Sequence, residues 1–451
     1  MNLTDDYSSD RFLIDLQIEE SLSRETLMSI DSSNRREDCI TLTFCFLLLF
    51  FTSIVGFYGP PVQRSFKILY RFLQNENTAS FPFHGLNQLN HFVQLKLSFL
   101  RINTTESISN TIILNSTVTL YQKNTVFSIE KFEKEEFPLY FEKGDNLSRP
   151  EIVFTDRLIK YDSTMVNVQF LSKTHQFIGC FAIWTFGDPE QPIIQMWFRG
   201  IYSIACLVSL FLFLMRLKKT PFKIWHLEQK LTAFLLLLAF FADDPFYFMQ
   251  TLEVTKAGVF YDVISSALFR TYLQFFVLAL FDSLRYKNRK IDSCFFAPKL
   301  LFFIFFALIE ILHGFIDDSQ TTLIMFMVPS IVRHIVSILQ RILGIIYLIW
   351  MIIAIIRAGT FIDITEKYKF SVYSSVSIMS ISVVMIVDLI ILPYKLLQNT
   401  SLSFVLNFTA QNLFVLLMAI FHWPYETLMD QQYHDTSQGV TENDFFMNVD
   451  D

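Results

Sequence analysis

The sequence has few of the residues from which catalytic and cofactor sites are usually built. Its 451 residues include only 12 glycines, five cysteines and eight histidines. It contains no His-Glu-x-x-His pattern, no phosphate-binding P-loop, no Gly-x-Gly-x-x-Gly fingerprint and no paired cysteine motif. We therefore expect neither an enzyme nor a bound cofactor or metal. The net charge of −7 argues against a nucleic-acid partner.

Apolar residues are abundant instead, and they are gathered into long runs. Hydrophobic residues make up 52% of the chain, with 51 phenylalanines. A bilayer-spanning helix needs about 18–20 consecutive apolar residues. The first such run covers residues 39–58, and seven more follow near 195–215, 229–250, 263–284, 300–316, 336–357, 371–392 and 404–424. The sequence therefore predicts an α-helical multi-pass membrane protein with one plus seven transmembrane helices, the last seven forming a domain over residues 192–425.

Residues 59–191, between the first and second apolar helices, have a different pattern. Val93, Leu95 and Leu97 alternate with polar residues, and similar short runs recur through the segment. Alternation with a period of two residues, broken by Asn, Asp, Ser and Gly, is typical of half-buried β-strands. We expect an all-β domain, either an antiparallel sandwich or a small barrel. Cys180 is its single cysteine, so no disulfide within the domain is expected.

Glycosylation sequons indicate on which side of the membrane this domain lies. Asn103, Asn115 and Asn146 each begin an Asn-x-Ser/Thr triplet within the β-rich segment. Acceptor asparagines lie on the surface and face the secretory lumen, so a luminal or extracellular domain is predicted. Asn399 falls in a predicted luminal loop and is a further candidate. Asn2 also begins a triplet, but it is predicted to lie in the cytosol and to stay unmodified.

The charged residues support the same orientation. Lys and Arg concentrate in alternate loops, beginning with the stretch from Arg216 to Lys230, and such residues mark cytosolic loops. Residues 1–38 and 426–451 are polar and acid-rich, which predicts a disordered cytosolic arm and tail. Residues 39–58 fit a retained signal anchor better than a cleaved signal peptide, because the apolar run starts late and is long. The predicted localisation is the Golgi and endosomes or the plasma membrane.

Charged residues inside the predicted helices are the candidate functional groups. The candidates for a ligand site or cavity are Asp243, Asp244, Arg270, Glu310, His313, Arg341 and Asp388. Counted at 1.5 Å per residue from the cytosolic loops, most lie in the luminal half of the bundle. A charge facing lipid is costly, so these side chains should face inward. They either line a cavity open to the lumen or form ion pairs that hold the bundle together, such as Asp244 with Arg270; their shared depth favours the cavity.

Three short motifs carry a resemblance to a known family. They are Trp197-Phe198-Arg199, Trp225 with Glu228-Gln229-Lys230, and Asp244-Pro245-Phe246. These motifs resemble the transmembrane protein 181 group of the Wntless-like family, over roughly residues 190–425. The resemblance implies a luminal GOLD-like β domain followed by a seven-helix bundle, in a protein of the secretory pathway. It brings no catalytic motif, and the residues from Trp225 onward are expected to form a turn at the membrane interface.

Two short strings in the tail have the form of trafficking signals. Tyr425-Glu-Thr-Leu428 has the spacing of a Tyr-x-x-hydrophobic sorting signal, and Phe445-Phe446 has the form of a diaromatic export signal. Signals of this kind are bound by cytosolic coat or adaptor proteins. Because such strings are short, they arise often by chance, and each is a hypothesis.

The function that these features favour is transport within the secretory pathway. The protein would be a sorting carrier or cargo receptor that binds a secreted or membrane protein through its luminal domain and a luminal-open helix cavity, in contact with membrane lipid. A seven-helix signalling receptor at the cell surface is the alternative. It is disfavoured because the Asp/Glu-Arg-Tyr and Asn-Pro-x-x-Tyr patterns of common receptors are missing. A transporter is a third possibility, although no internal repeat is evident.

Overall fold

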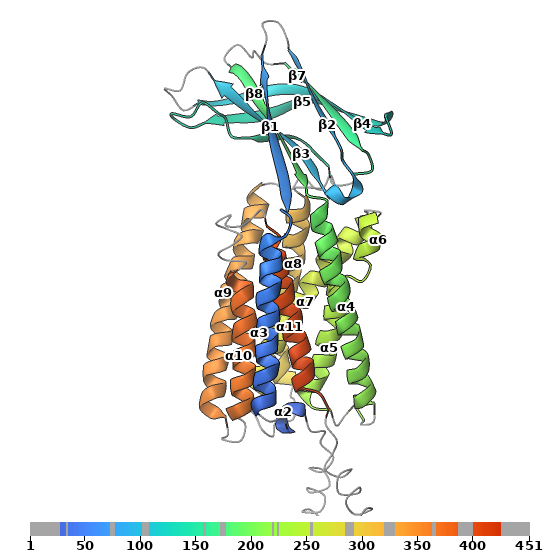
Figure 1. The fold of residues 1–451 in the computed structure, drawn as a ribbon. Helices are drawn as coiled ribbons and strands as arrows, with labels where there is room; N and C mark the ends of the chain where they lie inside the picture. Colours follow the sequence, from blue (N-terminus) through green and yellow to red (C-terminus); the bar gives the residue numbers. More distant parts are fainter. Residues whose placement is uncertain are drawn as a thin grey trace, which may run out of the picture.

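The chain folds into a β domain that stands on one end of a helix bundle (Figure 1). We name the two ends of the bundle the β-domain end and the tail end, the latter being where the short helix α2 (Ser29–Ser32) lies. The computed structural model describes residues 28–32, 35–72, 77–101, 108–156, 159–171, 177–218, 221–222, 225–252, 256–284, 293–319, 330–362, 367–386 and 400–424.

The β domain consists of two four-stranded sheets in which all paired strands are antiparallel. One sheet has the order β1-β8-β3-β6 and the other the order β2-β7-β4-β5. The strands are β1 (Gln63–Arg71), β2 (Thr78–His84), β3 (Val93–Arg101), β4 (Ile108–Gln122), β5 (Thr125–Phe141), β6 (Glu151–Asp156), β7 (Ser163–Phe170) and β8 (Phe177–Gly187), with a short 3-10 helix η1 (Gln88–Asn90) before β3. The predicted all-β domain is thus confirmed, as a pair of sheets.

Alternating apolar residues supply the core between the two sheets. Val93, Leu95 and Leu97 of β3 are completely buried, as the period of two predicts. Trp184 of β8 is also completely buried, and the ring of Phe83 lies 5.1 Å from it. These contacts between strands of different sheets give the domain a hydrophobic core of its own, separate from that of the bundle.

Cys180 of β8 is part of this core, and its thiol should be unreactive. Burial raises its pKa to about 12, and only the thiolate is a good nucleophile. We expect a variant that keeps Cys180 as its single cysteine to react with a maleimide at pH 8 only after denaturation. A variant that keeps only Cys39, which is exposed, should react at once and serves as the control. Rapid labelling of native Cys180 would contradict the packing described here.

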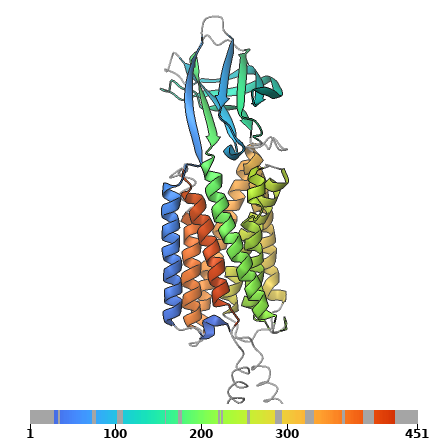
Figure 2. The same cartoon turned by 45° about the vertical axis from the view of Figure 1, so that its right-hand side comes forward.

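Among the described residues, eight long helices form the bundle. They run parallel or antiparallel to one another (Figures 1 and 2). They are α3 (Arg35–Tyr58), α4 (Glu190–Leu217), α5 (Leu227–Ala242), α7 (Lys256–Ser283), α8 (Ser293–Ser319), α9 (Ser330–Phe361), α10 (Lys367–Ile386) and α11 (Leu402–Phe421). Within the described residues, seven helices are long and apolar enough to cross a membrane, α5 being counted together with the short α6 (Tyr247–Leu252). The eighth member of the bundle, α10, stands between α9 and α3. The predicted multi-pass architecture is therefore confirmed.

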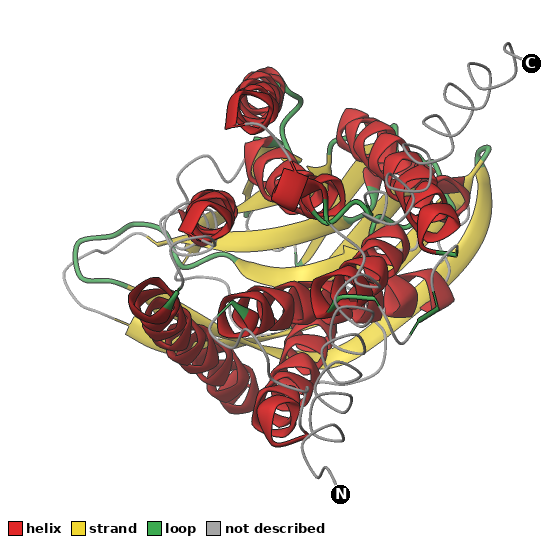
Figure 3. Ribbon diagram, turned by 90° about the horizontal axis from the view of Figure 1, so that it is seen from below, coloured by secondary structure: helices red, strands yellow, loops and turns green. Residues whose placement is uncertain are grey.

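Helix α11 is the centre of the bundle. It contacts α3, α4, α5 and α10, and most of its residues are buried. Gly56 of α3 lets the two backbones approach closely, since a Cβ atom there would lie 2.9 Å from the Cα of Leu402. Viewed from the tail end, the helix ends lie in front of the strands of the β domain (Figure 3).

Two adjacent strands join the β domain to the bundle. Helix α3 leads into β1 and β8 leads into α4, and these strands pair so that Gln63 faces Gly187. Arg64 Nε lies 2.5 Å from Asp188 Oδ2, and Asp188 is buried. Asn90 of η1 donates a hydrogen bond from Nδ2 to the Gly187 carbonyl at 2.9 Å. The junction is therefore a compact two-strand stem with η1 packed against it.

Candidate functional site

The polar site in the bundle is built where helix α5 breaks. The N–H of Asp243 still bonds to the carbonyl of Ala239 (2.8 Å), but Asp244 has a left-handed backbone (φ 51°) and Pro245 has no N–H to continue the helix. Asp244 Oδ1 accepts a hydrogen bond from Phe246 N at 3.2 Å and so closes the turn that leads into α6. The sequence Asp-Asp-Pro-Phe thereby holds two carboxylates inside the bundle, each 1% exposed.

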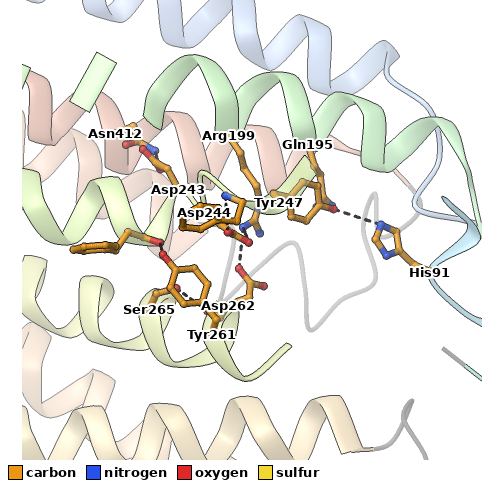
Figure 4. Close-up of polar contacts among 12 residues, drawn as sticks. His91, Gln195, Arg199, Asp243, Asp244, Tyr247, Tyr261, Asp262, Ser265 and Asn412 are labelled. Carbon is orange, nitrogen blue, oxygen red and sulfur yellow. Dashed lines mark hydrogen bonds and ion pairs between the residues drawn. The ribbon is translucent and has the colours of Figure 1, made fainter. Parts of the chain in front are cut away.

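Arg199 of α4 is the cation that faces these carboxylates (Figure 4). Its Nη1 lies 2.8 Å from Asp262 Oδ1 of α7 and 3.8 Å from Asp244 Oδ2. Its guanidinium also lies over the ring of Tyr247 of α6, 4.5 Å from the centroid. Arg199 and Asp244 are buried, whereas the side chain of Asp262 retains 38% exposure. One arginine thus ties together α4, the α5–α6 break and α7, with Asp262 at the solvent-accessible edge.

Asp243 belongs to a second set of contacts, directed toward the central helix. Its Oδ1 accepts a hydrogen bond from Asn412 Nδ2 of α11 at 2.8 Å. The Cys206 thiol of α4 lies 3.6 Å from the Oδ1 of the same asparagine. The two adjacent aspartates therefore face different helices, and together they connect the break in α5 to α4, α7 and α11.

Some buried polar atoms of the site take no part in the hydrogen bonds described above. Arg199 Nε and the Oδ2 atoms of Asp243 and Asp244 are buried without a hydrogen-bond partner among the described residues. Buried polar atoms normally have such a partner, so water or a polar group of a ligand would be stabilised here. In the part of the chain that the structure describes, no three His, Cys, Asp or Glu side chains are grouped to hold a metal ion. The chemistry of the site suits a polar or charged organic group.

Among the described residues, the β domain contacts this site at η1 and the His91 that follows it. Tyr247 donates a hydrogen bond from its hydroxyl to Gln195 Oε1 at 2.8 Å, and the same hydroxyl lies 3.4 Å from His91 Nε2. His91 follows η1 in a left-handed backbone conformation (φ 49°). Figure 4 shows His91 reaching toward Tyr247, whose ring lies between it and Arg199. A side chain of the β domain is therefore two contacts away from the buried ion pair.

The remaining predicted charges do not join this cluster. The predicted pairing of Asp244 with Arg270 is wrong, because Arg199 takes that place and the Arg270 side chain is exposed on α7. Glu310 Oε1 of α8 accepts a hydrogen bond from Gln340 of α9 at 2.9 Å, away from the α5–α6 break. His313 is half-buried on α8 and Arg341 is exposed on α9, whereas Asp388 lies outside the described residues. The prediction that these side chains face inward is wrong for Arg270 and Arg341, which are exposed.

Of the short sequence motifs, the one around Trp225 builds a turn, whereas Arg199 and Asp244 of the other two belong to the buried cluster. Trp225 packs against Phe222 with ring centroids 4.9 Å apart, and Lys230 Nζ lies 5.0 Å from the same Phe222 ring. Glu228 accepts a hydrogen bond from Ser283 of α7 at 2.8 Å, and the side chain of Gln229 accepts one from His226 N at 3.2 Å. This is the turn predicted between α4 and α5. The exposed members of the motifs are Trp197 and Phe246.

Sequence reasoning missed several members of the site. They are His91, Gln195, Tyr247, Asp262 and Asn412. Asp262 was placed just outside a helix predicted from residue 263, but α7 begins at Lys256 and carries it into the site. The sequence offered one indication that Asp262 belongs to the site, namely an aspartate next to the end of a predicted helix. Tyrosine, glutamine and asparagine occur widely in membrane helices and give no comparable signal.

A separate cavity lies at the other end of the bundle. It has a volume of about 640 Å³ and lies between α9 and α10, lined by residues that include Gly359, Lys367, Ser371 and Ser374. The buried cluster around Arg199 does not line it. None of the residues predicted to line a luminal cavity lines this pocket, and that cavity stays a prediction.

The fold and the site define a class of multi-pass membrane protein in which a β domain, inserted after the first helix, contacts a buried polar cluster of the bundle. Residues 193–426, just over half of the chain, match the family described as "Wntless-like, transmembrane domain", and the chain belongs to that family. It is also similar to transmembrane protein 181 of Homo sapiens, with 20% identity over 209 residues. That match covers 44% of this chain and 44% of the relative, so the chain is matched over less than half the length of that protein.

Proposed function

We propose that the protein is a carrier of the secretory pathway that binds a secreted or membrane protein through its luminal β domain. The observation that carries this proposal is the contact from His91 through Tyr247 to Arg199. It links a soluble domain, which can bind cargo, to an incompletely satisfied polar cluster in the bundle. A partner that binds across this junction would therefore alter the conformation of both the β domain and the polar cluster.

The chemistry of the junction suggests how cargo would be held. The partner would bury part of the β domain near η1 and supply a polar or charged group to the edge formed by Asp262 and Gln195. Asp262 is the accessible carboxylate of the cluster, so a cationic or hydrogen-bond-donating group fits best. The buried Arg199, whose Nη1 lies 2.8 Å from Asp262 Oδ1, would keep that carboxylate oriented.

A conservative substitution tests this role. Tyr247→Phe removes the hydroxyl that contacts Gln195 and His91 but keeps the ring over Arg199. A lost hydrogen bond is worth about 0.5–1.5 kcal/mol, so we expect recovery of co-purifying luminal proteins to fall about 2- to 10-fold without loss of expression. Tyr261→Phe is the matched control, because its hydroxyl donates to the Phe241 carbonyl and not to the β domain.

Localisation separates the carrier from the alternative. A carrier should cycle between the Golgi and endosomes, and its loss should leave a specific secreted or surface protein behind in early compartments. Stable residence at the cell surface, with no change in the secretion of any protein, would contradict the proposal and favour a seven-helix receptor.

Glycosylation provides a test of the orientation. Asn146 is exposed in the loop after β5, whereas Asn115 is half-buried in β4 and its Oδ1 accepts a hydrogen bond from Lys134 N at 2.8 Å. We therefore expect Asn146→Gln to remove a larger share of the glycan than Asn115→Gln, as measured by an endoglycosidase shift. Asn103 and Asn399 lie outside the described residues and remain candidates. A glycan on Asn2 would show that the orientation is reversed.

The tail signals lie outside the described residues and are tested by localisation. Changing Tyr425 and Leu428, or Phe445 and Phe446, to alanine should alter where the protein accumulates without lowering its expression. The reason is that the tail is polar and acid-rich in sequence, a composition that is not expected to form a folded core. Unchanged distribution of both variants by imaging would show that the strings arose by chance.

A further inference from the structure

Strand β1 forms one edge of its sheet and is exposed along most of its length. Among the described strands it pairs with β8 alone, in continuous register over its nine residues. Figure 2 shows β1, coloured blue, running from α3 along the outer side of β8. The consecutive residues Gln63–Leu69 are all exposed. An exposed edge strand of this length is a template for pairing with a strand of another molecule.

Two hydrogen bonds show which backbone groups of β1 face away from β8. Phe72 N donates to the Ile178 carbonyl at 3.1 Å, and Asp188 N donates to the Val62 carbonyl at 3.2 Å. Every second residue from Val62 to Phe72 therefore faces β8, because hydrogen-bonded pairs alternate along antiparallel strands. The intervening residues direct their N–H and C=O groups to the open side of the strand; they are Ser65, Lys67, Leu69 and Arg71.

The two faces of this edge differ in chemistry. On the core face, Phe66 stacks on Phe83 of β2 at 5.4 Å yet is 38% exposed, and Ile68 is 41% exposed. The hydrophobic core of the β domain is therefore accessible at this edge. On the opposite face, Lys67 and Arg71 are exposed, and the β8 residues opposite them carry no charge.

The other three sheet edges have features that prevent such pairing. The edge strand β2 contains Pro82, and β5 contains Pro138 and a run rich in Glu and Lys. The fourth edge strand, β6, is only six residues long. Proline, charge and short length are the means by which natural edge strands avoid pairing. By contrast, β1 has no proline, and all its charged residues are basic, so it would repel a basic segment and attract an acidic one.

We propose that the β1 edge binds an extended segment of a partner protein in which apolar residues alternate with acidic ones. The segment would add a strand to the sheet and form main-chain hydrogen bonds along β1. Its apolar side chains would cover Phe66 and Ile68, and its carboxylates would lie beside Lys67 and Arg71, as opposite charges do in stable cross-strand pairs. The inference rests on the proposed carrier function, because it places the cargo on this strand.

A second copy of the chain fits this edge less well. Because β1 continues from α3, the β1 strands of two copies in one membrane would leave it in the same direction (Figure 1). They would have to pair in parallel, which is the less stable arrangement. Both strands would also present Lys67 and Arg71, and like charges across a strand pair are destabilising. The acidic segment of a different protein is therefore the occupant that the edge favours.

Peptide binding to the full-length protein in nanodiscs tests the proposal. The probe is a fluorescent peptide of alternating Glu and Val, matched to β1 in length and measured by anisotropy. Methylating its backbone nitrogens, or exchanging Glu for Lys, should weaken binding at least five-fold. Lys67→Pro removes an outward N–H and should also weaken binding at least five-fold, while leaving the hydrogen bonds to β8. Ser80→Pro, an exposed change on the β2 edge, is the matched control and should leave binding unchanged.

Charge reversal tests the same edge without altering the backbone. Lys67→Glu combined with Arg71→Glu should reverse the preference, so that the Lys peptide binds better than the Glu peptide. The proposal is overturned if Lys67→Pro leaves binding unchanged, or if the Glu peptide does not bind the unmodified protein. Loss of a dimer in Lys67→Pro would overturn it as well, by assigning the edge to a second copy. The assay contains no cargo, so failure of the carrier function would be seen in localisation and co-purification and not here.

Discussion

Replacing Arg199 by glutamine is expected to have the largest effect of any single substitution in the bundle. Among the residues that the structure describes, Arg199 is the cation paired with Asp244 and Asp262, and Asp244 is buried. Removing one partner of a buried ion pair typically costs about 3–5 kcal/mol, because the remaining charge is left without compensation. We expect a large drop in folded protein, measured by size-exclusion chromatography of the detergent-solubilised protein after heating.

The controls for this prediction come from the same bundle. Arg270→Gln removes an exposed arginine from α7 and should change the melting behaviour little. Adding Asp244→Asn and Asp262→Asn to Arg199→Gln removes the unpaired charges and should restore much of the folded fraction. If Arg199→Gln melts like Arg270→Gln, the buried ion pair contributes nothing to folding. The polar cluster would then have to be explained by ligand binding alone.

Gly187→Ala should disrupt the junction between the β domain and the bundle. A Cβ atom at Gly187 would lie 2.2 Å from the backbone carbonyl oxygen of Asn90, a contact that requires the backbone to shift. Overpacking of this kind typically lowers the free energy of unfolding by about 1–3 kcal/mol. Because η1 carries the His91 loop, the shift would also move His91 away from Tyr247. We expect faster proteolysis of the β domain in intact membranes, with the helix bundle still folded.

Gly200→Ala in α4 is the matched control for this glycine. A Cβ atom there would meet no other atom within 4 Å, and alanine is favoured over glycine in a helix interior. We expect proteolysis equal to or slower than that of the unmodified protein. If Gly187→Ala behaves like Gly200→Ala, η1 is not packed against the stem as described.

Periodic features of the fold could be predicted from sequence, because local side-chain patterns determine them. The burial of Val93, Leu95 and Leu97 follows from their spacing alone, and the long apolar runs determine the helices. The break at Asp243 to Pro245 could also be recognised, since a proline in a helix interior removes a backbone hydrogen bond and kinks or breaks the helix. In these cases a few consecutive residues contain all the information needed.

Pairing between distant residues could not be predicted in the same way. Arg270 was the partner predicted for Asp244, and the choice of Arg199 in its place depends on how each helix is rotated about its axis. Asn412 and His91 contribute to the site through helix packing and a loop conformation, respectively. No sequence spacing relates them to Asp243 or Tyr247. The candidate charges were therefore identified more reliably than their partners.

The two-strand stem also bears on how such a protein can diversify. Because Gln63 and Gly187 face each other across a strand pair, the chain leaves and re-enters the membrane domain at points only about 5 Å apart. A different soluble domain whose ends are equally close could be inserted there without altering the path of α3 or α4. The membrane domain could thus be combined with a different soluble domain, provided that the inserted domain places a side chain against Tyr247.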